Sequence, residues 1–274
     1  MSATGAPDRR PPGLCAVVLA AGAGRRLRPL TRLRPKPLCP VAGRALVDLA
    51  LERARTVTGA VAVNVHHGRA ALEEHLARRP GVHVSVEEPE ALGTAGAVAQ
   101  LRSWIGGRDV LVLNADTWAP GDLSAAAAGW DRERVRLLVA GGDRLWPPER
   151  PTSPVVAALL PWSAVAGLEP VPSGLWEASW RARHARGRLE VVRWDGPCVD
   201  CGTPARYLAA NLAASGGWPV LGASCLVEGP VVRSVLWPGT HVRRGEALVG
   251  AVRATDAVTV LVRPAGSVRP AGSG

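Results

Sequence analysis

The chain has 274 residues, 47% of them hydrophobic, so it can bury a large core and is not an intrinsically disordered protein. Its net charge of +10 comes from arginines that are spread along the chain among acidic residues. That distribution fits small anionic substrates better than a nucleic acid, because it forms no basic stripe and no nucleic-acid motif. No stretch approaches the ~20 apolar residues that span a bilayer. We therefore expect neither nucleic-acid nor membrane partners.

The five cysteines indicate a reduced, cytoplasmic protein, because an odd number in a large domain argues against a disulfide framework. Cys198 and Cys201 form a single CxxC, which lacks the second pair or the histidines of a zinc site. Near the N-terminus, Arg9-Arg10 ahead of the apolar run 14–21 resembles a twin-arginine export signal. The run is short for that purpose and continues into a motif of mature structure, so we predict no export.

The first and last segments, residues 1–13 and 263–274, are rich in Pro, Gly, Ser and Arg, and we predict disordered tails there. Between residues 14 and 215, short apolar runs alternate with helix-compatible stretches, which predicts an α/β domain with a mostly parallel sheet and helices on both faces. The expected strands are Leu14–Ala20, Ala60–Val65, Val82–Val86, Val110–Leu113, Arg136–Ala140 and Val155–Leu160. The expected helices are Ala45–Arg55, Arg69–Arg78 and Thr94–Trp104.

In such a sheet, ligands bind beyond the carboxyl ends of the strands. The loops after Ala20, Val86 and Leu113 are therefore expected to converge on one crevice.

The pattern changes after Asn211, where apolar residues recur every sixth position. Residues 216–262 are predicted to form a short extension resembling a left-handed β-helix, which packs on the main domain because so few coils are not stable alone. Two ordinary strands are the plainer alternative. A homo-oligomer formed through this C-terminal segment is possible. The positions that carry the repeat are Val220, Leu226 and Val232, followed after a shift by Leu236, Val242 and Leu248.

One basic residue stands apart, because Lys36 is the only lysine of the chain. It follows the turn Gly22-Ala-Gly24 in a segment stiffened by prolines. Glycines let backbone N–H groups approach phosphate oxygens, and an ammonium is a compact point charge where a guanidinium is a wide fork. These features indicate a phosphate-handling lysine. Chance survival in a coding bias toward Ala, Gly, Pro and Arg is the alternative.

The segment from Leu19 to Gly43 resembles the signature of the sugar-phosphate nucleotidyltransferases, read as LAAGxGxRLxPLTxxxPKPLxPVxG. Further matches follow in the order of that family. They are Val63-Asn-Val-His-His67, Glu87 and Glu88 ahead of Leu92-Gly-Thr-Ala-Gly96, Leu113-Asn-Ala-Asp116, and Asp200-Cys-Gly-Thr-Pro204 leading into Tyr207 and Asn211. The resemblance covers roughly residues 14–215, and the C-terminal repeat is similar to that of mannose-1-phosphate guanylyltransferases. It implies a Rossmann-like nucleotidyltransferase sheet.

The resemblance also implies roles for individual residues. Arg26, Lys36 and Asp116 would be catalytic, with Arg26 and Lys36 neutralising the triphosphate of a nucleotide, GTP or UTP/dTTP. Asp116 and Asp200 would hold Mg²⁺ between them. The nucleotide-binding residues would be Ala20, Ala21, Gly22, Gly24, Arg25, Glu88, Gly93 and Thr94.

The chemistry of nucleotidyl transfer agrees with such a set. A sugar 1-phosphate oxygen attacks the α-phosphorus and pyrophosphate leaves in line. Because the second pKa of a phosphate monoester is about 6, the nucleophile is ionised at neutral pH and no general base is needed. Mg²⁺ takes one or two carboxylates plus phosphate oxygens, which suits Asp116 after its strand. Asp200 supplies a second carboxylate or, alternatively, begins the following helix.

His66 and His67 are expected to be structural, since adjacent residues at a strand end point to opposite faces and do not share a metal ion. The sugar-gripping Gly-x-x-x-x-Glu-Lys-Pro element of relatives is missing, and Trp146–Pro154 and Val155–Ala158 stand in its place. The base reader is also open, because Glu87, Glu88 and Glu90 each offer a carboxylate.

We therefore expect a Mg²⁺-dependent nucleotidyltransferase that forms an NDP-sugar, with a GDP-mannose-like product favoured. Two alternatives remain: a non-catalytic regulatory subunit that binds an NDP-sugar, and transfer to a phosphate acceptor that is not a sugar.

Overall fold

The computed structural model describes residues 13–141 and 154–262. The chain divides into two compact units, the first made of residues 1–22 and 47–198 and the second of residues 23–46 and 199–274. The predicted tails, apart from Gly13, and most of Trp146–Pro154 lie outside the described residues. The boundary expected after residue 215 falls inside the second unit. The helix just before it, residues 204–214, contacts strands of that unit that come earlier in the chain and a strand that comes later.

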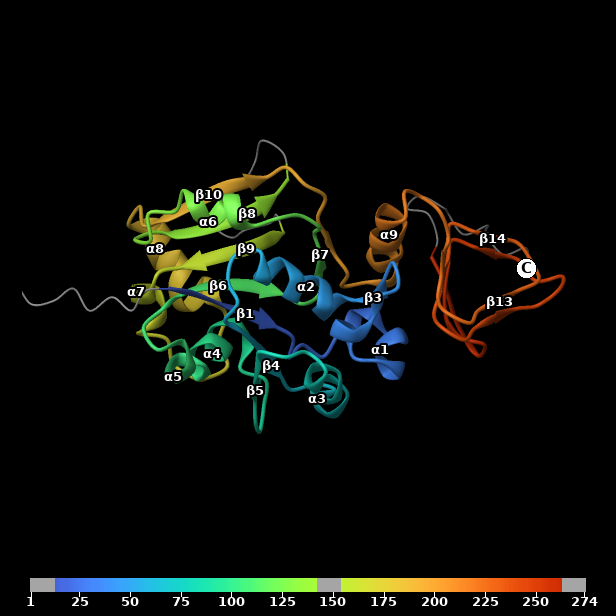
Figure 1. Cartoon of the computed structure of the whole chain (residues 1–274), viewed down its shortest axis with the longest axis horizontal. Helices are drawn as coiled ribbons and strands as arrows, with labels where there is room; N and C mark the ends of the chain where they lie inside the picture. The colour runs from blue at the N-terminus through green and yellow to red at the C-terminus, as the bar shows by residue number, and fades with distance from the viewer. Residues whose placement is uncertain (1–12, 142–153, 263–274) are drawn as a thin grey trace, which may run out of the picture. The chain divides into compact units, whose positions relative to one another are not determined.

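The first unit is built on a seven-stranded sheet in the order β10-β8-β9-β6-β1-β4-β5 (Figure 1). Only β9 runs antiparallel to its neighbours β6 and β8, so the predicted mostly parallel sheet is confirmed. The strands are β1 (Leu14–Leu19), β4 (Val61–Val65), β5 (Val82–Val86), β6 (Asp109–Asn114), β8 (Val135–Ala140), β9 (Val155–Leu160) and β10 (Leu189–Trp194). A short strand, β7 (Thr117–Trp118), follows β6.

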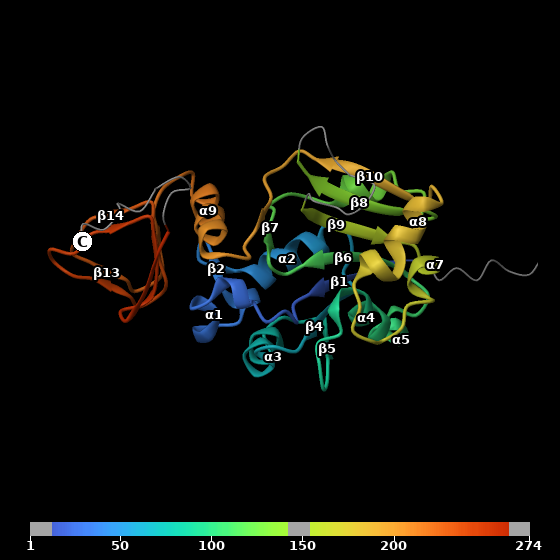
Figure 2. The same cartoon turned by 180° about the vertical axis from the view of Figure 1, so that it is seen from behind.

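Helices cover both faces of this sheet. One face carries α4, α5, α7 and the π-helical turn η3, whose apolar side chains pack on Cys15, Val17 and Val110. Alternate residues Ala16 and Val18 are equally buried, so the opposite face is covered as well. Figures 1 and 2 view these two faces in turn, with α2 in front in the first and α7 and α8 in front in the second. The helices are α2 (Leu46–Arg55), α3 (Arg69–Ala77), α4 (Gly93–Gln100), α5 (Arg102–Ile105), α6 (Ser124–Ala128), α7 (Trp162–Val165), η3 (Trp176–Trp180) and α8 (Arg181–Ala185).

The register of the sheet brings several loops to one edge. Leu19 at the end of β1 pairs with Asn64 in β4 on one side and with Asn114 in β6 on the other. The loops that follow β1, β4 and β6 therefore start side by side, and Val86 at the end of β5 pairs with Val65, so the loop after Val86 starts at the same edge.

The second unit begins with three short helical turns and a tight hairpin. These are η1 (Arg25–Leu27), α1 (Leu30–Leu33), η2 (Lys36–Leu38) and the strands β2 (Pro40–Val41) and β3 (Arg44–Ala45). Later in the chain follow β11 (Val199–Asp200) and α9 (Pro204–Ala214). The hairpin is held by α9, because Tyr207 donates to the Pro40 carbonyl and Ala42 N donates to Asn211 Oδ1 at 3.0 Å.

The C-terminal strands of the second unit form a coil that Figure 1 shows as a triangle. Each side of the first coil pairs in parallel with a side of the second, with Val220 opposite Val235, Leu226 opposite His241 and Val231 opposite Leu248. This confirms the predicted β-helix-like segment over two ordinary strands. The strands are β12 (Val220–Leu221), β13 (Leu226–Val227), β14 (Val231–Val232), β15 (Val235–Leu236), β16 (His241–Val242), β17 (Leu248–Val249), β18 (Ala251–Thr255) and β19 (Val258–Leu261).

Candidate functional site

The loop after β1 starts under tight backbone control. Ala20 N donates to Asn64 Oδ1 at 2.7 Å, and the Ala21 carbonyl lies 3.0 Å from His67 Nδ1. The next residue, Gly22, is exposed, and no described atom lies within 4 Å of the position where a Cβ would stand. Packing within the protein therefore does not require a glycine here. A ligand that closely approaches the backbone would require one, because it would meet a Cβ.

The two adjacent histidines are bound to backbone carbonyls, as a structural role predicts. His66 Nδ1 lies 2.9 Å from the Glu87 carbonyl, and His67 contacts Ala21. Their rings do not point to opposite faces, however, since their centroids are 4.6 Å apart in an edge-to-face arrangement. The reason is that β4 ends at Val65, so both histidines lie in the following turn and not on the strand.

A buried carboxylate connects two of the expected nucleotide-binding segments. Glu87 is 0% exposed and accepts hydrogen bonds from Asn64 Nδ2 at 2.7 Å and from Leu92 N at 2.8 Å. Since Asn64 also receives the N–H of Ala20, one continuous chain of hydrogen bonds joins the end of β1 to the residue before Gly93. Both carboxylate oxygens of Glu87 are thus bound inside the protein, and the side chain is not exposed to a ligand.

Glu88 has the opposite environment. Its side chain is 68% exposed and forms an ion pair with Arg69 on α3, which in turn pairs with Glu73 at 3.0 Å. Of the two adjacent carboxylates, only Glu88 is placed where a ligand can meet it. The exposed pair itself contributes little stability.

The glycines at the start of α4 are required by protein packing. A Cβ on Gly93, whose φ is +71°, would lie 2.5 Å from the Ser173 carbonyl oxygen, and one on Gly96 would collide with the Val171 carbonyl. The Thr94 hydroxyl is also engaged, accepting from Leu175 N at 2.8 Å. Segment 171–175 therefore covers one side of this turn. A nucleotide can meet Gly93 only on its other, exposed side.

Asp116 follows β6 by two residues and is partly exposed. The backbone before it is fixed, because Ala115 N donates to the Leu19 carbonyl at 2.9 Å. The carboxylate thus lies at the same edge of the sheet as Ala20, and its pairing with Asp200 stays a prediction.

In the second unit, Gly24 shapes the turn that precedes Lys36. Its φ of +61° is left-handed, and a Cβ there would lie 2.8 Å from Thr31 Cγ2 and 3.1 Å from Lys36 Cβ. The Gly24 carbonyl accepts from Leu27 N and from the Thr31 hydroxyl, each at 3.0 Å. Arg25 projects from the exposed side of η1. Gly24 is therefore explained by conformation and packing without a ligand.

Lys36, Arg26 and Asp200 lie together in the second unit, although 164 residues separate the lysine from the aspartate. Lys36 Nζ lies 3.5 Å from Asp200 Oδ1, and Arg26 Nη2 lies 3.7 Å from Oδ2. The lysine side chain is only 8% exposed, whereas that of Arg26 is 71% exposed. Gly202 keeps the space open, since a Cβ there would be 2.9 Å from both Arg26 Nη2 and Asp200 Oδ1.

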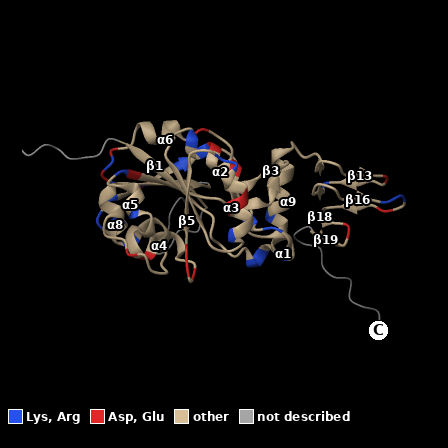
Figure 3. Ribbon diagram, turned by 60° about the horizontal axis from the view of Figure 1, so that its bottom comes forward, with Lys and Arg blue, Asp and Glu red and all other residues tan. Residues whose placement is uncertain are grey.

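Sequence reasoning missed a third cation at this point. Arg206 on α9 donates to Asp200 Oδ2 at 3.2 Å. Asp200 does not cap that helix, because the Thr203 side chain accepts from Arg206 N and Pro204 occupies the first turn. Figure 3 shows basic residues on α1 and α9 of this unit. The available signal was that Arg206 lies only 6 residues after Asp200, in the first turn of the helix that follows it.

The residues present fit a magnesium ion that is held mainly by substrate. Among residues 13–141 and 154–262, no three His, Cys, Asp or Glu side chains gather as a metal-ligating group. Mg²⁺ does not need such a cage, since it takes one or two carboxylates together with phosphate oxygens and water. Asp116 offers a partly exposed carboxylate of this kind. Asp200 offers another, whose oxygens face Lys36 and Arg206.

Residues 15–147 match the nucleotidyl transferase family. This segment is a nucleotidyl transferase domain. Over 136 residues the chain is 43% identical to an N-acetylmuramate alpha-1-phosphate uridylyltransferase of Caulobacter vibrioides, a match that covers 45% of this chain and 56% of that protein. A second protein of that description, from Neisseria meningitidis serogroup B, is 38% identical over 117 residues, covering 40% and 50%. The chain thus spans about half the length of these relatives.

Solved structures share the fold over most of the chain. A mannose-1-phosphate geranyltransferase of Thermus thermophilus superposes with a TM-score of 0.66 at 19% identity, covering 91% of this chain and 94% of that one. A UDP-glucose pyrophosphorylase of Acinetobacter baumannii gives 0.59 at 19% identity, covering 73% and 92%. At this level of identity the likeness shows the fold alone.

The described part of the chain contains no helix that is long and apolar enough to cross a membrane. All five cysteines lie within the described residues, and none of them forms a disulfide.

Proposed function

We propose that the protein transfers a uridylyl group from UTP to a hexosamine 1-phosphate, with N-acetylmuramate 1-phosphate as the preferred acceptor. The expected GDP-mannose-like product is not supported, because the relatives are uridylyltransferases. The observation that carries a phosphate-transfer function is the nearly buried Lys36 beside Arg26, Arg206 and Asp200. A buried ammonium with neighbouring guanidinium groups is suited to a triphosphate.

In the proposed reaction, an acceptor phosphate oxygen forms a bond to the α-phosphorus of UTP. The bond from that phosphorus to the β-phosphate oxygen breaks, and pyrophosphate leaves with the electron pair. No side chain needs to take a proton, because the acceptor phosphate is ionised at neutral pH. Lys36, Arg26 and Arg206 would bind and orient the polyphosphate. Backbone N–H groups around Gly22 would bind it from the first unit.

Mg²⁺ is part of the proposal. When bound, it would neutralise charge on the phosphates, held by Asp116 and Asp200. Glu88 is the proposed contact to the base or ribose, since its carboxylate is exposed where Glu87 is buried. Because the substrates are intracellular nucleotides and the cysteines form no disulfide, we place the protein in the cytoplasm.

The test is pyrophosphate release from UTP, GTP, dTTP and CTP, crossed with acceptors. N-acetylmuramate 1-phosphate and N-acetylglucosamine 1-phosphate differ only by the lactyl ether, so their kcat/KM ratio measures recognition of that group. Glucose 1-phosphate, mannose 1-phosphate and phosphocholine complete the panel. Preference for GTP, or for phosphocholine, overturns the assignment.

The same assay is repeated with Asp116→Ala across a Mg²⁺ titration. We expect a loss of about 100-fold or more in kcat that added Mg²⁺ does not restore. Full activity of this variant removes Asp116 from the mechanism. A wild-type chain that binds a UDP-sugar by calorimetry without Mg²⁺ and turns nothing over indicates a regulatory subunit instead.

A second copy of the chain is the proposed partner of the C-terminal coil. Leu221, Leu226 and Val232 of the first coil are about half exposed, and among the described strands β13 and β14 each pair on one side only. Light scattering of wild type and Leu226→Glu tests this: a monomeric wild-type protein contradicts it.

A further inference from the structure

A cavity of about 380 Å³ lies in the first unit, away from the loops that follow β1 and β6. It is formed by α7, the loop after it, η3, α8 and the turn that leads into β10. Trp162 N at the start of α7 donates to Asp109 Oδ1 at the start of β6, which fixes this region at the amino ends of the parallel strands. Figure 1 shows α7 and α8 opposite the arrowheads of β1 and β6.

Three arginines share this cavity. Arg183 lies on α8, and Arg186 and Arg188 lie in the turn after it. The turn folds back on the helix, because Arg188 N donates to the Arg183 carbonyl at 2.8 Å and Gly187 has a left-handed φ of +66°. The chain thus brings three guanidinium groups to one opening.

No acidic side chain of the described residues lines this cavity. Within residues 13–141 and 154–262, none of the three guanidinium groups forms an ion pair with a carboxylate, and the only side-chain hydrogen bond among them runs from Arg183 Nη2 to the Ser163 carbonyl at 2.6 Å. Other arginines of the chain, such as Arg79 and Arg136, do pair with carboxylates. Burial and the charges of Arg188 and Arg186 lower the pKa of Arg183, as expected for like charges brought together.

The other residues that line the cavity indicate what kind of ligand would fit it. Ser163 and Ser179 offer hydroxyl groups, and Leu168 with several alanines offers an apolar floor. The volume is in the range of small-molecule sites. In the part of the chain that the structure describes, no aromatic side chain lines the cavity, so nothing there is placed to stack on a nucleobase. Ser179 belongs to a π-helical turn, a rare conformation that is frequent at functional sites.

We propose that this cavity is a second ligand site that binds a phosphorylated sugar, with the phosphate held by Arg183, Arg186 and Arg188. Charge-assisted hydrogen bonds from guanidinium groups are the interactions that phosphate binding uses elsewhere in proteins. The site is separate from the proposed transfer reaction, since none of its residues belongs to the loops that carry Lys36, Asp116 or Gly22.

The test uses the full-length protein and glucose 6-phosphate as the probe, with unphosphorylated glucose and inorganic phosphate as comparison ligands. Hydrogen exchange locates the site. We expect glucose 6-phosphate to slow exchange in residues 176–190, glucose to have no effect there, and inorganic phosphate to act more weakly. Unchanged exchange of this segment at millimolar glucose 6-phosphate overturns the proposal, and equal affinity for inorganic phosphate overturns the assignment of a sugar ligand.

The variant is Arg186→Glu with Arg188→Glu, two exposed positions in the turn after α8. It is expected to lower the affinity for glucose 6-phosphate at least about tenfold, since it removes charge-assisted hydrogen bonds and places two negative charges beside the phosphate. Arg181→Glu is the matched control, an exposed arginine of α8 outside the cavity lining, and should bind as the wild type does. Equal loss in the control contradicts a specific site. Uridylyl transfer at saturating substrate should be unchanged in both, so failure of this proposal and failure of the proposed function are separate results.

Discussion

Asn64 donates a hydrogen bond of 2.7 Å to Glu87 and accepts one of 2.7 Å from Ala20 N. These two hydrogen bonds connect the loop after β1 to the loop before α4. Because Leu92 N donates to the second oxygen of Glu87, the position of Gly93 depends on this buried carboxylate. Glu87 is therefore a positioning residue.

Replacing Glu87 with Gln should weaken the proposed uridylyl transfer. Both partners of Glu87 are N–H donors, and a Gln amide satisfies only one of them, so the loop before Gly93 loses its anchor. We expect kcat/KM for UTP to fall about 10- to 100-fold, mainly through KM. The control is Glu133→Gln, an exposed exchange far from this network. A Glu87→Gln enzyme with wild-type KM for UTP contradicts the positioning role.

The two glycines of the first loop should respond differently to alanine. At Gly24 the left-handed φ and the contact with Thr31 predict a loss of about 1–2 kcal/mol in the free energy of unfolding. At Gly22 nothing in the described protein meets a Cβ, so stability should change by less than ~0.5 kcal/mol while the KM for UTP rises. Urea unfolding and steady-state kinetics distinguish the two effects. Unimpaired kinetics in Gly22→Ala shows that UTP does not approach this backbone.

Lys36→Arg should inactivate the enzyme although it keeps the charge. The lysine side chain is nearly buried, and its Cβ already lies close to Gly24, so a planar guanidinium has no room in the same position. We expect kcat to fall about 100-fold or more, as in Lys36→Ala. Arg28→Lys, the reverse exchange at an exposed position of the same segment, should stay within about twofold. An active Lys36→Arg enzyme rules out the need for a compact ammonium.

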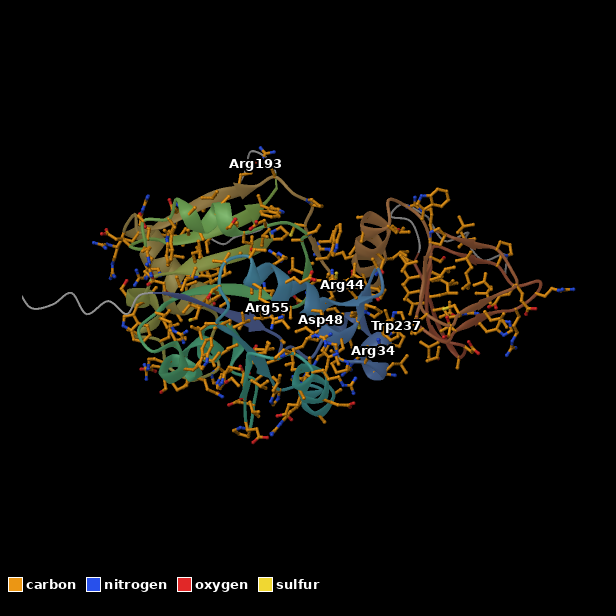
Figure 4. The ribbon with its side chains drawn as sticks, viewed as in Figure 1. Arg34, Arg44, Asp48, Arg55, Arg193 and Trp237 are labelled. Carbon is orange, nitrogen blue, oxygen red and sulfur yellow. The ribbon has the colours of Figure 1, made fainter. Side chains whose placement is uncertain are left out.

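Asp48 links α2 to α3, and its variant should show a pH-dependent loss of stability. Burial raises the pKa of this carboxyl, but hydrogen bonds from Arg79 at 2.7–2.8 Å and His75 at 2.9 Å outweigh it and hold the pKa below 3.8. Figure 4 labels Asp48. A depressed pKa in the folded state stabilises it above the unfolded pKa of about 3.9, and that contribution is lost as the pH falls through the folded value.

We therefore expect Asp48→Asn to lower the free energy of unfolding by about 1–3 kcal/mol at pH 7, with the difference from wild type shrinking below about pH 4. Urea titrations at several pH values measure it. Glu74→Gln, which breaks an exposed pair with Arg78, should change little at any pH. A difference for Asp48→Asn that is constant down to about pH 3 would falsify the linkage.

Tyr207→Phe should destabilise the second unit. The fully buried hydroxyl donates to the Pro40 carbonyl and accepts from Trp237 Nε1 at 3.0 Å, so its removal leaves two buried groups without that partner. The expected loss is about 1–3 kcal/mol in the free energy of unfolding. A change below about 0.5 kcal/mol in Tyr207→Phe would show that water or another group replaces the hydroxyl.

Trp237 has a second contact in this unit. Figure 4 labels it beside Arg34, whose guanidinium lies 5.1 Å from the Trp237 ring centroid.

Several strands were predictable to within a residue, since β9 is a short apolar run and β5 alternates valine with polar residues. The antiparallel direction of β9 was not, because the apolar pattern of a buried strand is the same in both directions. The edge strand β10 was missed. It is only half-buried, and Glu190 and Arg193 interrupt its apolar run.

By itself the sequence determined the alternating α/β pattern and the β-helix-like extension, and through its resemblance it predicted roles for Arg26, Lys36, Asp116 and Asp200. Local spacing and residue type suffice for these, because they reflect backbone propensity and the chemistry of phosphate. The tertiary structure decided which of two adjacent residues of the same type is buried and which glycines are required by packing. Glu87 is buried and Glu88 is exposed. Gly93 and Gly96 must be glycines because carbonyl oxygens of segment 171–173 lie where a Cβ would stand. Burial and close backbone approach depend on segments distant in the chain, and only folding brings those segments together.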